Sequence, residues 1–348
     1  YMKKTKKKIA LILGVKDQDG IILSKILIKK KYEIHGIARS KYKYCKLKKN
    51  YLKNINFYKL NLCETKKIIQ LINKIGPDEI YNFAGISDLK NSEKDKEFTL
   101  KVNFTYVKNI LDNIYNKDLK IKFFQSLSSE MFEINNLSNI NVINEKSRFK
   151  VNNFYSLSKI KLYKYIINLR KKKNALIYCG FLFNHDSLHR DKRFIIKKIS
   201  NHLKKKIINN PMKINNIYYR KDISHADNIV EGIYNLMQNK IIYDVVIGSG
   251  KFISIKEIIN LFTKKLAINS KWIRNRNKIY CKKLIIILPN QKHPAQYHKK
   301  KQESFFILYG KVNLKINNKN YIINPGELKT IKPGEIHEFS SKTGAIIE

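Results

Sequence analysis

Cysteine, proline and tryptophan are scarce in this chain of 348 residues, which contains 4 Cys, 6 Pro and 1 Trp. The cysteines are scattered and form no Cys-x-x-Cys pair, so reduced thiols in a cytoplasmic protein are expected rather than a disulfide framework. No apolar run approaches the roughly 20 residues of a membrane-spanning helix. The N-terminal residues lead directly into a predicted strand and lack the apolar segment of a signal peptide. We therefore expect no membrane partner.

Arginine is scarce too, because only 8 of the 71 basic residues are Arg, yet the formal net charge is +44. Such a charge can indicate a nucleic-acid or acidic membrane partner. It can equally reflect a lysine-rich composition spread over every solvated face. Lysines occur along the whole chain, and no basic stripe alternates with aromatic residues as single-strand binding requires. We favour the second interpretation and expect no nucleic-acid partner, although the field would attract anionic small molecules.

Strand-like and helix-like segments alternate from residue 8 to about residue 267. Strands are predicted at 8–13, 33–38, 55–62, 79–84, 121–126, 175–183 and 242–247. Helices are predicted at 20–30, 64–75, 95–116, 155–172, 192–206, 226–239 and 254–265. The alternation predicts an α/β fold with a doubly wound, Rossmann-like parallel sheet. Ligands of such sheets bind at the carboxyl ends of the strands.

The loop after the first predicted strand reads Gly14-Val-Lys-Asp17-Gln-Asp-Gly20. Its spacing is that of a dinucleotide loop, G-x-x-G-x-x-G, with Asp17 in place of the middle glycine. Asp17 brings a negative charge to where a pyrophosphate would approach, and Lys16 would offset part of it. A structural turn is the alternative, but the strand context favours a dinucleotide site. Arg39 ends the second strand and favours NADP over NAD, because a cation suits a 2′-phosphate.

Two further segments carry candidate proton-transfer groups. Tyr155-Ser-Leu-Ser-Lys159 opens a predicted helix, and residues four apart share a helix face, so Tyr155 and Lys159 should project together. An ammonium group beside a phenol is expected to lower the pKa of the tyrosine, as a tyrosine base requires. Tyr-x-x-x-Lys alone is common by chance here. Ser128 and Glu130, which follow a predicted strand upstream, make the set more specific.

Six segments occur in order along this part of the chain. They are Gly14-Val-Lys-Asp-Gln-Asp-Gly20, Tyr32-Glu-Ile-His-Gly-Ile-Ala-Arg39, Pro77-Asp-Glu-Ile-Tyr-Asn82, Phe124-Gln-Ser-Leu-Ser-Ser-Glu-Met-Phe132, Asn144-Glu-Lys146 and Phe181-Leu-Phe-Asn-His-Asp-Ser187. Together they closely resemble GDP-mannose 4,6-dehydratases, members of the extended short-chain dehydrogenase/reductase superfamily. The resemblance spans roughly residues 8–267.

The resemblance implies a redox-neutral lyase acting on a nucleotide sugar. NADP takes a hydride from C4 of the hexose while Tyr155, supported by Lys159, removes the hydroxyl proton, and Ser128 bonds the C4 oxygen. Glu130 abstracts the C5 proton, water leaves from C6, and the hydride returns to C6. The implied cofactor-binding residues are Gly14, Asp17, Gln18, Asp19, Gly20, Arg39, Asn61, Leu62, Ala84, Ser87, Tyr155, Lys159 and His185. The implied substrate-binding residues are Asn184 and Arg190. Such enzymes are usually homo-oligomers, which we expect here.

Several positions depart from the family pattern. Asp17 replaces a phosphate-loop glycine, and Asp88 stands where the family usually has His. Asn61 stands where an Asp normally approaches adenine, and Lys221 takes the place of an Arg, which is not a conservative change at a phosphate contact. The match fades after about Ala267, before the family's final nucleotide-contacting segment. These departures predict weakened cofactor and substrate binding.

The C-terminal part has a different pattern. After a basic linker at 268–283, short apolar runs broken by Pro and Gly predict an antiparallel sandwich or barrel at 284–348. Gln296-x-His298-x4-Glu303-x6-Gly310 and Pro333-Gly334-x2-His337 resemble the two motifs of cupins. The resemblance implies a small all-β cupin-like barrel, shortened at its end, with metal ligands at Gln296, His298, Glu303 and His337. Imidazole with carboxylate suits Fe, Mn, Ni or Zn, whereas structural histidines are the alternative.

Three functional classes follow. The first is a nucleotide-sugar 4,6-dehydratase, at residues 1–267, with a cupin appended. The second is a short-chain fold kept as a binding scaffold or another nucleotide-sugar epimerase, with the cupin as a sugar-binding or isomerase module. Nucleic-acid binding by charge ranks third. Ser128, Glu130, Tyr155 and Lys159 favour the first class, whereas Asp17 and the missing substrate tail favour the second.

Overall fold

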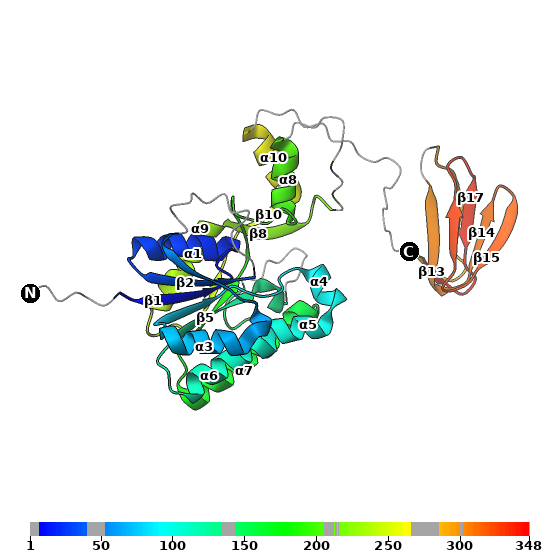
Figure 1. Ribbon diagram of the computed structural model, residues 1–348. Helices are drawn as coiled ribbons and strands as arrows, with labels where there is room; N and C mark the ends of the chain where they lie inside the picture. The colour runs from blue at the N-terminus through cyan, green and yellow to red at the C-terminus, as the bar shows by residue number, and fades with distance from the viewer. Residues whose placement is uncertain are drawn as a thin grey trace, which may run out of the picture. The chain divides into compact units, whose positions relative to one another are not determined.

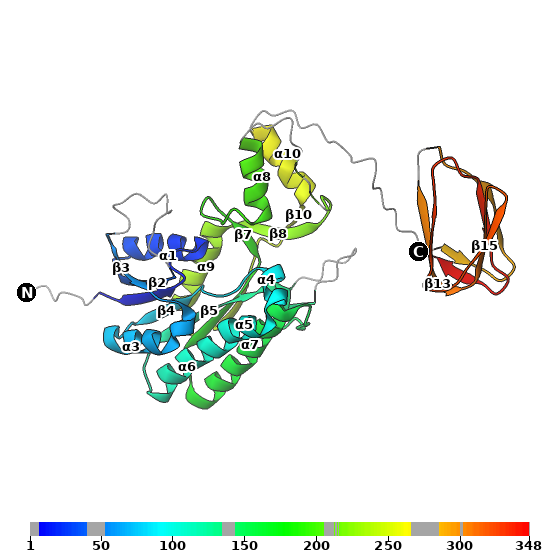
Figure 2. The ribbon, with the colours of Figure 1, turned by 45° about the vertical axis from the view of Figure 1, so that its right-hand side comes forward.

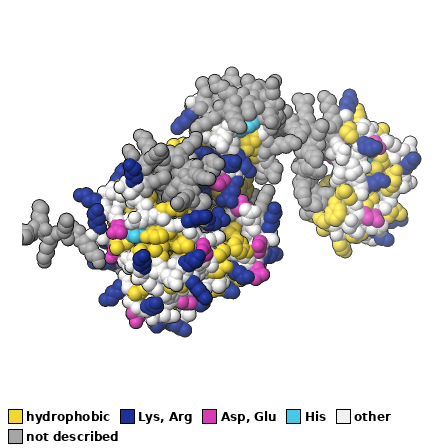
Figure 3. All heavy atoms as spheres, in the orientation of Figure 1, with side chains coloured by type: hydrophobic (Ala, Val, Ile, Leu, Met, Phe, Trp, Pro, Cys, Tyr) yellow, Lys and Arg dark blue, Asp and Glu magenta, His cyan; other side chains and the backbone are white. Residues whose placement is uncertain are grey.

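The computed structural model describes residues 7–39, 53–133, 143–204, 212, 214, 216–265, 285–299 and 302–347. The chain divides into two compact units, Tyr1–Ser270 and Lys271–Glu348. Among the described residues, no helix combines the length and apolarity needed to cross a membrane. Lysine and arginine side chains are spread over the visible described surface of both units rather than gathered in one stripe (Figure 3).

The first unit is built on a seven-stranded parallel sheet of order β3-β2-β1-β4-β5-β6-β9. Its strands are β1 Ile9–Leu13, β2 Glu33–Ala38, β3 Ile55–Lys59, β4 Glu79–Asn82, β5 Lys122–Ser128, β6 Ile177–Leu182 and β9 Asp244–Ile247. Central strands such as β6 are buried along their whole length, because helices cover both faces of a parallel sheet. The predicted doubly wound fold is confirmed.

Two apolar clusters hold the helices against the two faces of this sheet (Figures 1 and 2). One face carries α3 Thr65–Ile75, α6 Tyr106–Asn116 and α7 Phe154–Lys173, and the other carries α1 Gln18–Lys29 and α9 Ala226–Gln238. Short turns complete the edge at the strand ends: η1 Leu62–Glu64, α4 Leu89–Lys94, α5 Lys96–Leu100 and η3 Ser129–Met131. The loops that should hold ligands therefore lie together above a rigid sheet.

The helix predicted at 95–116 is interrupted. The structure has α5, then a π-helical turn, η2 Lys101–Thr105, and then α6. The π-turn places Asn103 in the interior, where its side chain bonds both backbone groups of Ile86: Nδ2 donates to the carbonyl at 3.0 Å, and Oδ1 accepts from the amide at 2.9 Å. Periodicity alone cannot predict such a turn, which inserts one residue without breaking the helical pattern.

A small second sheet in the first unit was not predicted. It has the order β10-β8-β7 and consists of β7 Asn184–Asp186, β8 Arg220–His225 and β10 Phe252–Ser254. Helices α8 Ile195–Lys204 and α10 Ile255–Lys265 pack together beside it through a separate apolar cluster. Strands β7 and β8 are polar and β10 has only three residues, so none has the apolar run on which strand prediction depends.

The second unit consists of two four-stranded antiparallel sheets, of order β11-β18-β13-β16 and β12-β17-β14-β15. The strands are β11 Ile285–Ile287, β12 Lys292–Gln296, β13 Glu303–Gly310, β14 Val312–Ile316, β15 Lys319–Ile323, β16 Leu328–Ile331, β17 His337–Ser340 and β18 Ala345–Ile347. Alternate residues of these strands form one core, as in Val312, Leu314 and Ile316. The predicted small all-β barrel is confirmed, whereas the 268–283 linker lies outside the described residues.

Candidate active site

Ser128, Glu130, Tyr155 and Lys159 meet where the carboxyl end of β5 faces the start of α7. Ser128 ends β5, and its Oγ accepts a hydrogen bond of 3.2 Å from the backbone amide of Glu130 in η3. Ser128 lies close enough to the Tyr155 hydroxyl to lower its pKa, and the Lys159 ammonium lies 5.8 Å from the centre of the Tyr155 ring. The structure therefore brings together the four predicted catalytic residues.

Local sequence explains this placement. Asn153 caps α7 by accepting from the Ser156 amide at 2.8 Å, and the Ser156 hydroxyl oxygen accepts in return from the Asn153 amide at 3.1 Å. This reciprocal cap fixes where the helix begins, and therefore the direction in which Tyr155 points. One turn later, Lys159 donates to the Ser126 carbonyl of β5 at 2.9 Å and attaches the helix to the sheet.

The expected lowering of the tyrosine pKa is wrong for the protein without ligands. Burial raises the pKa of Tyr155 to about 12, which outweighs the lowering by the nearby Ser128 hydroxyl. Burial also lowers the pKa of Lys159 to about 8. The ammonium points at the Ser126 carbonyl rather than at the phenolic oxygen, so desolvation dominates both groups. Spacing along a helix predicts that two residues share a face, but it does not predict which atom the charged group contacts.

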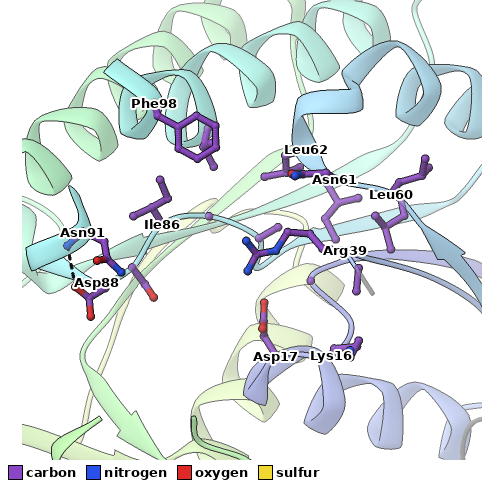
Figure 4. A pocket seen from close by; sticks show the side chains of 18 of the residues that line it. Lys16, Asp17, Arg39, Leu60, Asn61, Leu62, Ile86, Asp88, Asn91 and Phe98 are labelled. Carbon is purple, nitrogen blue, oxygen red and sulfur yellow. Dashed lines mark hydrogen bonds between the residues drawn. The ribbon is translucent and has the colours of Figure 1, made fainter. Parts of the chain in front are cut away.

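A cavity of about 550 Å³ opens at the same edge of the sheet, over the loop between β1 and α1 (Figure 4). Its lining includes seven of the predicted cofactor-binding residues, drawn from separate elements: Gly14, Asp17, Arg39, Asn61, Leu62, Ala84 and Ser87. Asp88, Asn91, Phe98 and Arg193 also line it and were not predicted as contacts. Arg39 reaches into the cavity from the end of β2.

The glycine loop has the tight geometry that its spacing predicts. Gly14 has φ +87°, a left-handed conformation that favours glycine. A Cβ on Gly20 would collide with the carbonyl oxygen of Gly14, so α1 packs directly against the loop. Asp17 precedes α1 and makes no capping hydrogen bond with its side chain. Burial raises the pKa of Asp17, and Asp19 raises it further, while Arg39, Arg193 and Lys16 lower it.

Three predicted cofactor-binding residues, Gln18, Asp19 and His185, lie outside the lining of this cavity and bond to one another or to their neighbours. The Gln18 amide donates to the His185 carbonyl at 3.2 Å, and the Ser187 hydroxyl donates to the Gln18 side chain at 3.0 Å. His185 Nε2 lies 3.1 Å from both oxygens of Asp19. Burial lowers the pKa of His185, but the Asp19 carboxylate more than reverses this and the net pKa is raised. The two dehydratase-like motifs thus join α1 to β7.

A second cavity, of about 200 Å³, lies beside the catalytic residues. Its lining includes Glu130 and the predicted substrate residue Asn184, together with Tyr219 and Lys221. The Lys221 ammonium lies 3.5 Å from Glu130 Oε1. Arg190, the other predicted substrate residue, lies outside this lining: its guanidinium stacks 3.6 Å from the centre of the Phe194 ring, with Nε 3.7 Å from Asp186 Oδ1.

Asn103 is a buried site residue that motif spacing did not identify. Besides holding Ile86, its amide donates to Ser158 Oγ in α7 at 3.2 Å. A Cβ on Gly85 would lie 2.9 Å from Asn103 Oδ1 and 4.0 Å from the Lys159 ammonium. Asn103 therefore fixes the loop after β4 against the catalytic helix. A buried polar residue inside an apolar helical stretch was the available signal.

In the second unit, His298, Glu303 and His337 form a cluster whose potential ligand atoms all lie within 4.8 Å of one another. His337 Nε2 is 3.0 Å from Glu303 Oε2, and His298 Nε2 is 3.4 Å from Glu303 Oε1. Gln296 Nε2 lies 3.4 Å from His337 Nε2. His298 Nε2 is buried and makes no hydrogen bond. An orphaned imidazole nitrogen facing a carboxylate and a second imidazole is a donor set that fits a divalent metal.

Solved structures show where this fold occurs. UDP-glucose 4-epimerase from Thermotoga maritima, solved with UDP-glucose, superposes with a TM-score of 0.67 at 13% identity, covering 76% of this chain and 84% of that one. dTDP-glucose 4,6-dehydratase from Bacillus anthracis, solved with NAD, gives 0.64 at 15% identity, covering 75% and 82%. The first unit has the fold shared by these nucleotide-sugar epimerases and dehydratases.

Sequence comparison narrows this class. Residues 11–307 match the family described as GDP-mannose 4,6 dehydratase, and the chain belongs to that family. The human GDP-mannose 4,6 dehydratase is 29% identical over 266 residues, covering 72% of this chain and 70% of that protein. The Vibrio cholerae enzyme is 27% identical over 282 residues, covering 77% and 74%. Residues 283–347 match the cupin domain. The family match thus continues beyond residue 267, and the predicted boundaries stay predictions.

Proposed function

We propose that the first unit is a nucleotide-sugar 4,6-dehydratase that acts on a GDP-mannose-like substrate and yields a 4-keto-6-deoxy sugar nucleotide. The single observation that carries the proposal is the placement of Ser128 and Tyr155 close together, with Glu130 beside them, between two cavities. One cavity is large enough for part of a dinucleotide, and the other is lined by Glu130. The oxidation needs a site for the dinucleotide, and the elimination needs an acid/base group beside the sugar, so the reaction needs both cavities.

Each residue has a role that its position supports. Tyr155 accepts the proton of the C4 hydroxyl, and Ser128 bonds the same oxygen, since the two side chains lie close to each other. Glu130 removes the C5 proton and delivers it to the departing C6 hydroxyl, which leaves as water. C5 is protonated again when C6 is reduced, and this balances the proton taken from the C4 hydroxyl. Lys221, 3.5 Å from Glu130, holds this carboxylate over the second cavity. Asn184, in the same lining, would orient the sugar.

The residues of the larger cavity fit an NADP cofactor, with NAD as the alternative. Gly14 and the amides at the start of α1 form the anion-binding end expected of such a loop. Arg39 supplies the cation that suits a 2′-phosphate. When bound, this cofactor supplies the acceptance of a hydride from C4 and its return to C6. Asn103 holds the backbone of Ile86, which lines this cavity, and Lys159 is attached to β5 through the Ser126 carbonyl.

Incubation of the purified protein with NADP and GDP-mannose, followed by detection of the 4-keto product, tests the proposal. Glu130→Gln should still oxidise C4 but fail to eliminate water, so reduced cofactor should accumulate while turnover falls about 10²- to 10⁴-fold. Conversion of the nucleotide sugar into another product without loss of water would contradict the proposal. Full activity in Glu130→Gln would contradict it as well. The absence of both product and cofactor binding would favour a binding scaffold instead.

A second proposal concerns the cupin-like unit, which we infer to bind a divalent metal through His298, Glu303 and His337, with Gln296 beside them. The orphaned Nε2 of His298 favours it. His298→Ala should lower the metal content of the full-length protein to near zero after dialysis, as measured by elemental analysis. His293→Ala is the matched control, because this histidine stacks on Phe339 outside the cluster. Equal metal content in wild type and His298→Ala would exclude the site.

A further inference from the structure

Asp17 carries its carboxylate into the part of the larger cavity where a glycine loop normally presents backbone alone. Asp17 Oδ2 lies 3.1 Å from the position that a Cβ on Gly14 would occupy, so the carboxylate lies against the loop although the residue itself is exposed. Figure 4 shows this side chain at the start of α1, directed into the cavity. A pyrophosphate bound at the loop would meet this negative charge.

Three cations are close enough to Asp17 to lower its pKa: Arg39, Arg193 and Lys16. They enter the cavity from different elements. Lys16 belongs to the glycine loop itself, and Arg39 ends β2 beside Leu60 and Asn61, at the end suited to the adenosine ribose. Arg193 comes from the segment that precedes α8, far from the glycine loop in the sequence. Arg193 is therefore the cation that a distant segment adds to the phosphate region.

The present contacts of Arg193 are weak enough to be exchanged. Its Nε lies 3.5 Å from Asp191 Oδ1, and both side chains are about half exposed, at 52% and 54%. Exposed ion pairs of this kind contribute little to stability. A guanidinium has five N–H donors in a planar fork and can bond a carboxylate and a phosphate oxygen at the same time. Lysine lacks this geometry.

We propose that Arg193 is a cofactor-binding residue whose guanidinium bridges the Asp17 carboxylate and the nearest cofactor phosphate. The Asp17–Arg193 pair thus replaces the phosphate loop without side chains that the glycine spacing predicts. The proposal rests on the proposed function, because it requires a dinucleotide phosphate at this loop. It assigns a binding role to a segment that the family resemblance did not mark and explains how a loop containing Asp17 accommodates a diphosphate.

The test is a double-mutant cycle on NADP binding, with the dissociation constant measured by titration of the full-length protein. Arg193→Gln should weaken binding about tenfold or more in the wild type, but about threefold or less in the Asp17→Gly background, because the bridged carboxylate is then absent. Arg193→Lys should fall near Arg193→Gln. Arg148→Gln is the control, since Arg148 is exposed and outside both cavity linings. Thermal melting verifies that each variant is folded.

Other outcomes overturn the proposal. Equal weakening by Arg193→Gln in both backgrounds would show that Arg193 acts without Asp17, and no weakening would show that it does not contact the cofactor. NADP binding that weakens as the pH rises, and that is the same in the wild type and Arg193→Gln, would show that Asp17 is accommodated by protonation instead. If neither wild type nor Asp17→Gly binds NADP or NAD, the proposed function itself fails. Binding that is unaffected by Arg193 overturns this proposal alone.

Discussion

The catalytic residues and the larger cavity lie on the same edge of the sheet but are built differently. Tyr155, Lys159 and Ser128 are each less than 10% exposed, and Lys159 is bonded to β5. The cavity is rimmed by loops and carries exposed charges of both signs, such as Asp95 and Arg193. Packing therefore fixes the chemical groups, while ligand affinity depends on loop residues that can change with little effect on the fold.

The largest effect that this comparison predicts is on turnover. Tyr155→Phe keeps the ring that fills the buried space and removes only the hydroxyl beside Ser128. Turnover should fall on the order of 10²- to 10⁴-fold, with the melting temperature and NADP affinity nearly unchanged. Steady-state kinetics on GDP-mannose check this. Tyr218→Phe, at a tyrosine that is 61% exposed, should keep wild-type activity. More than about a tenth of wild-type turnover in Tyr155→Phe would show that another group moves the proton.

The next effect concerns the buried lysine and depends on pH. Because burial lowers the pKa of Lys159 from 10.5 to about 8, the unfolded chain binds more protons than the folded one between these values. The free energy of unfolding of the wild type should therefore rise by about 2 to 3 kcal/mol from pH 8 to 10, relative to Lys159→Met. Above pH 10, the raised pKa of Tyr155 acts in the opposite direction.

Urea unfolding at a series of pH values measures this difference. Lys164→Met is the matched control, because Lys164 lies on the exposed face of the same helix and should leave the pH dependence of the wild type intact. Parallel pH curves for the wild type and Lys159→Met would mean that the lysine keeps its usual pKa. The buried catalytic cluster would then be wetter than its packing indicates.

The smallest effect tests the cavity side of the comparison. Gly20→Ala places a methyl group against the backbone of Gly14 and Val15, which is not free to move away from β1. It should lower the free energy of unfolding by about 1 to 3 kcal/mol and weaken NADP binding. Gly232→Ala, in α9, meets only side-chain atoms of Ile247 at 3.5 Å or more and should be neutral or stabilising. Denaturant unfolding measures the free energy of unfolding of both variants. Equal changes in the two would show that the loop shifts to make room for the methyl group.

Sequence patterns predicted the sheet and its helices well, because β1 and β6 are buried apolar runs and α7 begins at a clear cap. They did not predict the sheet containing β7 and β8, whose short polar strands are formed by pairing with each other. Pairing between distant segments leaves no local period in the sequence. Boundaries between elements were close, as for α7 against the predicted 155–172.

The candidate site was predicted in part. Motif spacing identified the residues that meet at the end of β5, but it did not predict that Gln18 and His185 would bond each other rather than line the cavity. It also assigned a lowered pKa to Tyr155, because charge proximity along a helix ignores desolvation. Arg193 and Asn103 were missed, since neither belongs to a motif whose chemistry can be inferred from type and spacing.

The π-turn at η2 has a consequence for the tolerated length of this segment. Each residue advances an α-helix by about 100°, so the extra residue in Lys101–Thr105 offsets the two halves of the helix against each other. Deleting one residue here would restore a regular helix. The apolar face could then point at the core in only one of the two halves of the helix. Asn103 would rotate away from Ile86 and Ser158. The segment therefore accepts substitutions far more readily than a change of length.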